Sequence, residues 1–478
     1  MHSLVELNAV ELASAIRSRN VSCLEVMGAY LAHIDRLNPQ VNALVAMRDH
    51  GILLDEASAL DRSLDKGQAP GLLYGLPQAP KDILPVAGMV TTKGSPIFKD
   101  TVPNEDAISF ARMRDAGALF IGRSNSPEFG LGGHTYNPVY GITRNAFRPQ
   151  LSAGGSSGGA GSAVALHLLP MADGSDMMGS LRTPAAFNNV FGLRTTPGLV
   201  PHGAAIQNAH PEFSVSGPMA RNIPDLSLLL SVMAGKNILQ EGQPQPLTLA
   251  TYQQELQQDF SQTRIGWLGD LGGHLPMEQG VIPLCEAALT HFTALGAKTE
   301  ALTPDFDFNA LWRAWIDLRS LTVATANKDL YDNPATRALL KPEAVWEIER
   351  GLGLDKASID KARQTQQAWK ETVQTLFTTY DYLILPSAQV FPFAAETHWP
   401  DRIGNQSMDT YHRWMQAVIP ATMAGLPTLA APAGFSPEGY PMGIQIMAAP
   451  WRESALLRLG HAYDQASGYA RIASPLLA

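Results

Sequence analysis

The sequence predicts an α/β fold, in which helices alternate with buried strands. The first observation is one unit of this alternation: a helical pattern at 106–116 stops at Gly117, and the apolar segment 118–121 follows at once. The second observation comes from the C-terminal part, where an amphipathic helical pattern at 452–468 follows three apolar segments of strand length. These segments lie at 380–386, 427–433 and 443–450. Helix, glycine and buried strand in succession are typical of α/β domains.

The N-terminal residues 1–65 are predicted to form a helical part. Asn8 with Glu11 and Ser22 with Glu25 are capping-box pairs, and an apolar stripe at helical spacing follows each of them. The second helix is expected to end ahead of Pro39, because proline has no N–H to donate within a helix. We interpret both stripes as core-facing surfaces.

Three later stretches have distinct characters. Residues 70–96 are punctuated by Gly and Pro and predict short strands and turns. Residues 130–204 are rich in Gly, Ser and Asn, but an apolar helical pattern at 163–169 interrupts them, which favours tight backbone packing over a linker. Residues 306–380 predict consecutive helices that leave the main sheet. With no internal repeat, we expect one domain over 1–478.

Composition narrows the functional class. The chain has 478 residues, of which 45% are apolar and 17% charged, and its formal net charge is −9. We therefore expect no nucleic-acid partner, because such partners require a basic footprint. No apolar run approaches the roughly 18 residues that span a bilayer, and the N-terminus lacks a signal-peptide pattern. Two cysteines, far apart, fit a reducing compartment. We expect a cytoplasmic protein without a membrane partner; the sequence gives no indication of its oligomeric state.

Several common site motifs are absent from the sequence. It contains no phosphate-binding G-x-x-x-x-G-K-[ST], no H-E-x-x-H and no C-x-x-C, and its 12 histidines are scattered. We therefore expect no metal and no cofactor. Residues 154–158 satisfy G-x-S-x-G, the nucleophile elbow of α/β-hydrolases, and His202, His398 and His461 follow downstream. The preceding residues, NAFRPQLSA, make a poor central strand, which disfavours that interpretation.

Three segments together carry a longer pattern. They are Pro80-Lys81-Asp82, the run GGSSGG at 154–159, and DMMGSLRTP at 176–184. This combination closely resembles the amidase signature family, in which the two working serines are 24 positions apart. Ser156 and Ser180 have that separation here, which selects Ser156 over Ser157. The likeness also covers the N-terminal helical part, residues 114–130 and residues 424–468, and so nearly the whole chain.

The resemblance implies a fold, a reaction and a set of residues. The fold would be a mixed, twisted β-sheet with helices on both faces. Ser180 would be the nucleophile, Ser156 a proton shuttle that follows a cis peptide bond, and Lys81 the base. The backbone N–H groups of Met177, Met178, Gly179 and Ser180 would form the oxyanion hole. The substrate would be a small-molecule amide or related acyl compound, and 306–380 would line or cover its site.

The residues themselves are compatible with these roles. A serine hydroxyl needs a base, and a lysine can serve only when it is neutral. The ordinary lysine pKa of about 10.4 must therefore fall toward neutrality, which burial among apolar residues such as Pro80 and Ile83 would achieve. Pro184 suits the first turn of a helix, so Ser180 is expected just ahead of a helix N-terminus.

Four neighbouring residues need a separate interpretation. Met178 stands where the family usually has glycine; we expect it to keep the turn and line the acyl pocket. Asp176 and Arg182 are expected to brace the turn, with substrate contact by Arg182 as the alternative. His134 and Tyr136 lie in a Gly-rich segment and either border the pocket or pack in the core.

Three rival functions share these residues. The first is a carbamate or ester hydrolase with the same triad, because the acyl chemistry is shared. The second is an amidotransferase subunit that amidates charged tRNA with the help of partner subunits; Met178 and the helical segment 306–380 disfavour a glutamine-specific site. The third is a catalytically inactive binding protein, which the presence of all three working residues disfavours.

Overall fold

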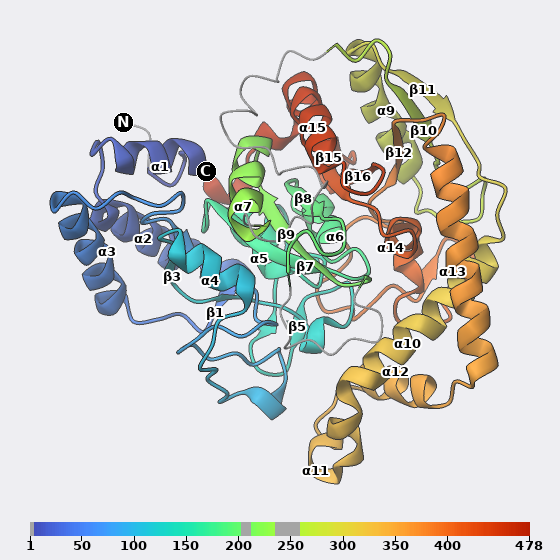
Figure 1. Ribbon diagram of the computed structural model, residues 1–478, viewed down its shortest axis with the longest axis horizontal. Coiled ribbons are helices and arrows are strands. Elements are labelled where there is room, and N and C mark those ends of the chain that lie inside the picture. The colour runs from blue at the N-terminus through green and yellow to red at the C-terminus, as the bar shows by residue number, and fades with distance from the viewer. Residues whose placement is uncertain (1–3, 202–211, 235–258) are drawn as a thin grey trace.

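The structure is a computed structural model that describes residues 4–201, 212–234 and 259–478 (Figure 1). Its helices are α1 Ala9–Arg17, α2 Cys23–Val41, α3 His50–Asp65, α4 Ile108–Asp115, α5 Gly158–Ala165, α6 Arg182–Phe187, α7 Ile223–Ala234, α9 Val281–Ala294, α10 Phe308–Asp332, α11 Pro334–Arg337, α12 Pro342–Leu352, α13 Lys356–Leu376, α14 Ile419–Met423 and α15 Glu453–Ser467.

Among the described residues, the main sheet has eight strands. Their spatial order is β11-β10-β12-β16-β15-β8-β9-β7. The strands are β7 Met171–Asp176, β8 Phe191–Arg194, β9 Val215–Ala220, β10 Arg264–Trp267, β11 Lys298–Ala301, β12 Tyr382–Pro386, β15 Thr428–Phe435 and β16 Pro441–Met447. The strand β10 runs parallel to β11 and β12, and the remaining pairs are antiparallel. The predicted mixed sheet is confirmed.

Helices cover both faces of this sheet, as predicted. Gly192 of β8 pairs with Ala430 of β15, and a Cβ on Gly192 would meet Ala185 of α6. Leu429, the residue before Ala430 in β15, lies against Gly460 of α15. Because consecutive strand residues point to opposite faces, α6 and α15 lie on opposite faces. The helix α5 packs with α6, and α7 and α9 pack with α15.

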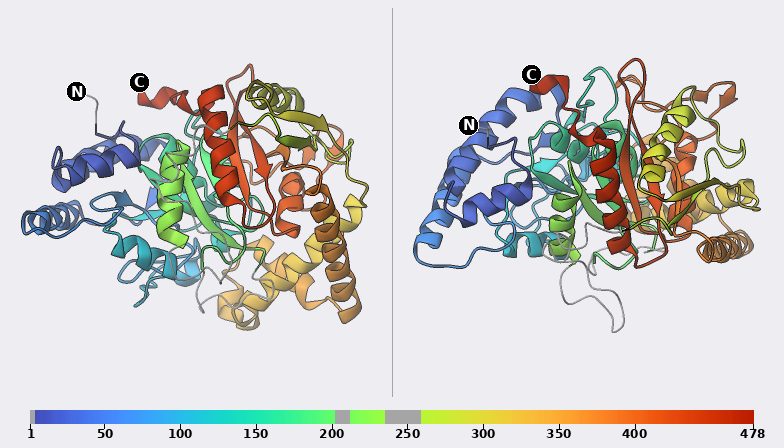
Figure 2. Two further views of the ribbon diagram at one scale, coloured as in Figure 1. Left: turned by 45° about the horizontal axis from the view of Figure 1, so that its top comes forward. Right: turned by 90° about the horizontal axis from the view of Figure 1, so that it is seen from above.

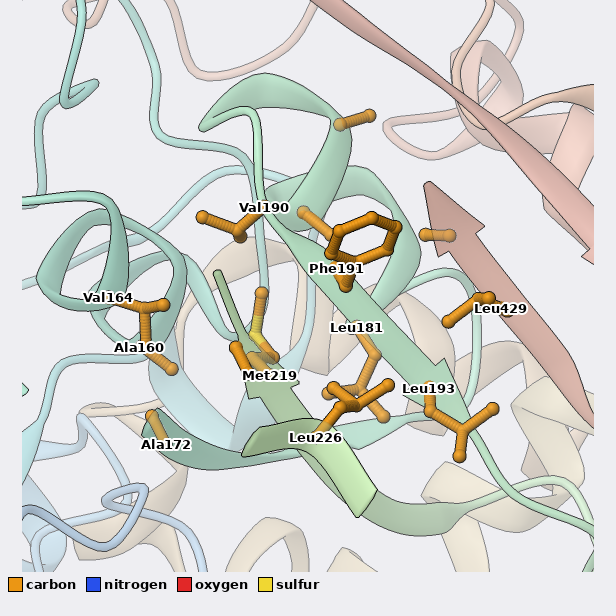
Figure 3. Close-up of a cluster of buried hydrophobic side chains, with 14 of the residues drawn as sticks. Ala160, Val164, Ala172, Leu181, Val190, Phe191, Leu193, Met219, Leu226 and Leu429 are labelled. Atoms are coloured by element: carbon orange, nitrogen blue, oxygen red, sulfur yellow. The ribbon is translucent and has the colours of Figure 1, made fainter. Parts of the chain in front are cut away.

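The core fills both spaces between sheet and helices. Figure 3 shows the part around β7, β8 and β9, where side chains from α5, α7, these three strands and β15 meet. These side chains, all at most 1% exposed, include Ala160, Val164, Ala172, Leu181, Val190, Phe191, Leu193, Met219, Leu226 and Leu429. Burial of this apolar surface holds β7 and α6 in place, and the turn between them carries Ser180.

Short strand pairs lie outside the main sheet. They are β1 Leu44–Val45 with β4 Arg123–Ser124, β2 Pro77–Gln78 with β3 Leu119–Phe120, β5 Tyr136–Asn137 with β6 Gly141–Ile142, and β13 Arg402–Ile403 with β14 Gln406–Ser407. The predicted strand at 118–121 is therefore real but short. It pairs with β2 just ahead of Lys81 instead of joining the main sheet.

Two N-terminal predictions have different outcomes. Both capping boxes are present, at the starts of α1 and α2. The prediction that the second helix ends before Pro39 is wrong, because α2 continues to Val41. The bond that Pro39 cannot make would go to the carbonyl of exposed Asp35, which water can reach, while buried Leu37 and Val41 favour the last turn.

The helices of the 306–380 segment form a group of their own. In Figures 1 and 2 the helices α10–α13 lie on the opposite side of the main sheet from α1–α3. The helix α10 packs along α12 and α13, and α13 contacts α14. Two of these helices, α11 and α12, lie between the two helical patterns that the sequence showed.

The described residues include both cysteines and all the helices that can be compared with the thickness of a membrane. Cys23 in α2 and Cys285 in α9 are buried free thiols. Across the ranges described here, no helix is both long and apolar enough to cross a bilayer.

Candidate active site

A cavity of about 920 Å³ opens beside the turn that joins β7 to α6. Ser156, Ser175 and Ser180 line it, together with Met177 and Met178. The helix α10 contributes Arg319, Thr322, Val323, Ala326 and Asn327 to its wall. Residues from three distant parts of the sequence therefore meet at one cavity.

Lys81, three residues after β2, does not line the cavity itself but contacts two of the serines that do. Its backbone N–H donates to both carboxylate oxygens of Asp173, at 3.2 Å each. Its ammonium donates to Ser156 Oγ at 2.7 Å, to Ser157 Oγ at 2.9 Å and to Ser175 Oγ at 3.0 Å. Three hydroxyl groups thus surround the nitrogen, and each can accept from an ammonium or donate to a neutral amine.

Burial determines the protonation of this lysine. Lys81 is 2% exposed. Removal from water lowers the pKa of Lys81 to about 7, against the opposing pull of the Asp173 and Asp176 charges. A neutral amine is therefore available near physiological pH, as the sequence required of a base.

The Gly-Ser loop that carries Ser156 is pressed against another backbone segment. A Cβ on Gly155 would lie 2.9 Å from the backbone nitrogen of His134, so only glycine fits. The peptide bond between Gly155 and Ser156 is cis. The N–H of Ser157 donates to the carbonyl of Ser180 at 3.2 Å, which ties this loop to the Ser180 turn. Ser157 is the N-cap residue of α5.

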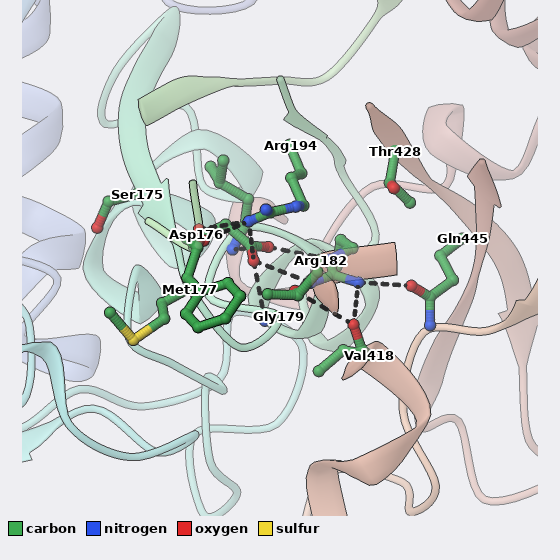
Figure 4. Close-up of polar contacts among 12 residues, drawn as sticks. Ser175, Asp176, Met177, Gly179, Arg182, Arg194, Val418, Thr428 and Gln445 are labelled. Carbon is green, nitrogen blue, oxygen red and sulfur yellow. Dashed lines mark hydrogen bonds and ion pairs between the residues drawn. The ribbon is translucent and has the colours of Figure 1, made fainter. Parts of the chain in front are cut away.

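The Ser180 turn is braced by buried charges (Figure 4). Asp176 accepts from the N–H groups of Gly179 at 3.0 Å and Leu181 at 3.1 Å, and it pairs with Arg182 at 2.9 Å and Arg194 at 3.3 Å. Burial by itself would raise the pKa of Asp176, but the two guanidinium groups outweigh it and hold that pKa well below its ordinary value.

Arg182 is fully committed to this brace. Its remaining donors go to the carbonyl of Val418 at 2.7 Å, Gln445 Oε1 at 2.8 Å and Thr422 Oγ1 at 3.0 Å. The side chain is inaccessible to solvent and is not among the residues that line the cavity. The bracing interpretation of Asp176 and Arg182 is confirmed, and the substrate-contact alternative is wrong.

Met178 does not need a left-handed conformation. The residue of the turn with positive φ is Gly179, at +79°, and a Cβ there would lie 2.8 Å from Val418. Met178 is 3% exposed and lines the cavity, as expected. The helix α6 has only six residues, because Asn189 is left-handed and β8 begins at Phe191. A helix of six residues adds little dipole potential at Ser180.

The sequence interpretation missed three residues around Lys81. They are Ser157, which it set aside, and Asp173 and Ser175 of β7. The signal was the period of two in β7, which places Asp173 and Ser175 on the same face of the strand. Burial raises the pKa of Asp173 to about 6, against the attraction of Arg123 and Lys81.

The other candidate side chains lie elsewhere. His134 donates through Nε2 to the Ala395 carbonyl, and its Nδ1 is bonded to the Ser152 hydroxyl. Tyr136 donates to Glu343 and stacks on His398. Neither His134 nor Tyr136 lines the cavity, so both belong to the packing alternative. His461 lies in α15, and His202 lies outside the described residues. In the parts of the chain that the structure covers, no three His, Cys, Asp or Glu side chains are grouped to hold a metal ion.

Comparison with known proteins gives consistent results. A family model described as Amidase matches residues 25–457. An acylamidase of Rhodococcus erythropolis is 32% identical over 97% of this chain and 96% of its own. A glutamyl-tRNA(Gln) amidotransferase subunit of Thermus thermophilus is 34% identical over 97% of this chain and 99% of its own.

The solved structures agree with the sequence comparisons. The crystal structure of a bacterial aryl acylamidase of the amidase signature family superposes with a TM-score of 0.89, at 25% identity and 97% coverage of both chains. The family model and both curated relatives likewise extend over most of the chain. This chain therefore belongs to the amidase signature family.

Proposed function

We propose that the chain hydrolyses a carboxamide C–N bond through an acyl-enzyme on Ser180, with Lys81 as base and Ser156 as proton shuttle. The observation that carries this proposal is the buried contact of 2.7 Å between Lys81 Nζ and Ser156 Oγ, beside a cavity that Ser180 also lines. A lysine with a pKa of about 7 can accept a proton from a hydroxyl at neutral pH.

The proton and the bonds follow a simple course in this mechanism. Neutral Lys81 takes the Ser156 proton while Ser156 takes the Ser180 proton, and Ser180 Oγ attacks the carbonyl carbon. The same route returns the proton to the nitrogen as the C–N bond breaks and the amine leaves. A water molecule then repeats the sequence and hydrolyses the ester bond to Ser180. In the intermediate state, Ser156, Ser157 and Ser175 accept hydrogen bonds from the Lys81 ammonium.

The oxyanion is assigned to the β7–α6 turn. We propose that the N–H groups of Met177, Met178, Gly179 and Ser180 stabilise it, with the Gly179 N–H shared between the oxyanion and Asp176, to which it donates at 3.0 Å. Each donor of this kind is worth about 3 kcal/mol in the transition state. The brace around Asp176 would keep these donors oriented before the substrate arrives.

Replacement of the nucleophile tests the proposal. Ser180→Ala should lower kcat by three orders of magnitude or more for any accepted amide, as loss of a hydrolase nucleophile does. Ser157→Ala is the matched control: it removes one hydrogen bond to Lys81 and should cost only about tenfold. A fluorophosphonate probe should label Ser180. Near-normal turnover by Ser180→Ala, or labelling at Ser157, would contradict the assignment.

The similarity to an amidotransferase subunit supports a second candidate, glutamine hydrolysis within a complex. The cavity favours the first candidate, because about 920 Å³ with Phe98, Phe129, Ile108 and Val323 in its walls suits a larger, more apolar substrate than glutamine. We also propose that residues 306–380 cover the site, with α10 as the wall. The chain purified alone should hydrolyse an anilide faster than glutamine; the reverse preference would favour the amidotransferase.

The type of acyl bond that is cleaved (amide, carbamate or ester) requires a separate test. Carbamates and esters use the same acyl chemistry, so the triad by itself does not select the amide. We would measure kcat/KM for an anilide, a urethane and an ester and divide each value by the rate constant of the uncatalysed hydrolysis. This ratio should be largest for the anilide. A urethane in first place would assign the chain to carbamate hydrolysis.

A further inference from the structure

Two neighbouring turns at the cavity share an unusual backbone. Lys93 and Gly94 have φ of +52° and +65°, and Phe129 and Gly130 have φ of +54° and +69°. Lysine and phenylalanine rarely adopt this left-handed conformation, because their Cβ crowds the backbone. Such positions persist where the surrounding structure imposes them, and they concentrate at functional sites.

The two turns are fixed to each other and to the site. The N–H of Phe129 donates to the Lys93 carbonyl at 2.8 Å. Ser95 Oγ donates to Glu128 at 2.6 Å. On the other side, the N–H of Thr92 donates to Asp82 at 3.0 Å. Asp82 directly follows Lys81, so the position of Lys93 is coupled to that of the proposed base.

The side chains that these turns present form one corner of the cavity. Lys93, Phe98 and Phe129 line the same cavity as Ser156 and Ser180. The Lys93 Nζ lies 4.9 Å from the centroid of the Phe98 ring, and Phe98 meets Phe129 edge to face at 6.3 Å. An ammonium group thus stands beside an aromatic pair.

The other ionisable side chains in the cavity wall are either ion-paired or exposed to solvent, unlike Lys93. Arg319 is paired with Glu347 at 2.6 Å, and Asp106 is paired with Arg114 at 2.7 Å. Glu105 is exposed at the rim. Within the described ranges, Lys93 has no ion-pair partner and no acceptor for its ammonium other than the Phe98 ring. Burial lowers the pKa of Lys93, against the attraction of Asp82, as expected for an ammonium with no close counter-ion.

We propose that Lys93, Phe98 and Phe129 form a subsite for a carboxylate carried on an aromatic or similarly flat apolar part of the substrate. The carboxylate would supply the counter-ion that Lys93 lacks, and the ring would pack against the aromatic pair. The substrate class is thus an amide with an anionic aryl group at a distance from the scissile bond. This proposal rests on the proposed function, because it assigns the cavity to the substrate.

The experiment measures binding instead of turnover. In a Ser180→Ala background, calorimetry compares 4-acetamidobenzoate with 4-acetamidobenzamide, which have the same shape but differ in charge. The carboxylate should bind about tenfold more tightly, as expected for one charge-assisted hydrogen bond in a partly buried site. Lys93→Met should reduce this ratio to about one, and Lys93→Arg should retain it.

A neighbouring lysine provides the matched control. Lys99→Met removes the same charge from a nearby position in the chain whose side chain does not line the cavity, and it should leave the tenfold ratio intact. The melting temperature of Lys93→Met should be no lower than that of its parent, because the lost ammonium is unpaired. If Lys93→Met does not fold, Lys93→Gln replaces it.

The outcomes are distinct. Equal binding of the two ligands by the parent, an unchanged ratio in Lys93→Met, or a lost ratio in Lys99→Met would each overturn the subsite. None of these results depends on Ser180 being the nucleophile. Failure of the proposed function would instead appear as turnover by Ser180→Ala.

Discussion

At the residue scale, the central feature is a lysine held in an environment that disfavours its charge. The ammonium of Lys81 has three serine hydroxyl groups as neighbours and no carboxylate at ion-pair distance among the described residues. Hydroxyl groups stabilise a cation less than a carboxylate does, so burial prevails and the pKa falls to about 7. A closer acid would have restored the charge, and Lys81 could then not act as the proposed base.

This pKa predicts the pH dependence of the reaction. The proposed base works only when Lys81 is neutral, so kcat/KM should rise with pH and level off above about 7. Initial rates with an uncharged anilide over roughly pH 5 to 9 give the profile. A profile that is flat over this range, or one that falls as pH rises, would count against Lys81 as the base.

Gly179 provides a second prediction at the residue scale. Gly179→Ala would place a methyl group 2.8 Å from Val418 in a residue with φ of +79°. The turn must shift, so we expect a loss of about 100-fold in kcat, since one displaced oxyanion donor costs that much. Gly273→Ala is the control: φ is +86° there, but nothing lies within 4 Å of the added methyl group.

Both glycine variants lose about 1 to 2 kcal/mol of stability to the left-handed backbone. Only Gly179→Ala should lose activity, measured as kcat at saturating substrate. Equal activity of the two variants would show that the turn tolerates displacement and that its N–H groups are not essential.

At the element scale, the site depends on contacts between elements that are far apart in sequence. Arg319 of α10 donates to Glu347 of α12 at 2.6 Å and to Tyr411 at 2.8 Å, and it contacts the Met177 sulfur at 3.4 Å. One buried guanidinium therefore connects the helical segment to the proposed oxyanion turn. Its charge is balanced by Glu347, which is itself fully buried.

Removal of the Glu347 charge should destabilise the folded protein. Glu347→Gln leaves Arg319 buried without a counter-ion, and we expect the free energy of unfolding to fall by about 3 to 5 kcal/mol. Glu349→Gln, on the same helix, removes the charge that pairs with half-exposed Arg337 but keeps an oxygen that can accept from Tyr331. It should cost less than about 1 kcal/mol. Denaturant unfolding of both variants checks the difference. Similar losses of stability in the two variants would show that the buried pair contributes no more to stability than the half-exposed pair.

At the scale of the whole molecule, the sheet organises the site. The strand β7 at one edge carries Asp173 and Ser175, and the turn after it carries Ser180. The short pair β2–β3 brings Lys81 alongside, and Ser157 is the N-cap residue just ahead of α5. The protonation of Lys81 is thus a property of the folded chain, so the stability of the whole protein depends on it.

This linkage has a definite sign. The folded protein loses the Lys81 proton at about pH 7 and the unfolded chain at about 10.4, so the unfolded chain binds more protons between these values. The free energy of unfolding from this group therefore rises with pH through that window. Lys81→Met, which has no charge to bury, should be more stable than the parent by a few kcal/mol below pH 7.

The difference between Lys81→Met and the parent should narrow as pH rises from about 7 toward 10. Denaturant unfolding of the two proteins at several pH values tests this prediction. A constant difference, or a variant that is less stable at pH 6, would mean that Lys81 is not held against a cost of burial.

Some features of the fold were predictable from the sequence and others were not. The capping boxes of α1 and α2 and the C-terminal strands were predictable because their signals are local: a hydrogen bond over three residues, or an unbroken apolar run. The C-terminal ends of α2 and α6 were not predictable. The burial of Leu37 and Val41 extends α2 past Pro39, and the start of β8 limits the length of α6. The Arg182 brace could be expected from the sequence, but its partners Val418 and Gln445 could not.

The fold class and the family were predictable from the sequence, and the fixed spacing of the motif along the chain led to the proposal of Lys81, Ser156 and Ser180 as the working residues. The surroundings of these residues became visible in the folded chain: Ser157 and Ser175 beside the lysine, Gly179 as the left-handed residue of the turn, and Lys93 in the cavity wall. The physical reason is that a pKa, a steric contact or a missing counter-ion depends on neighbours in space. Those neighbours come from strands and helices that the sheet brings together from distant parts of the chain.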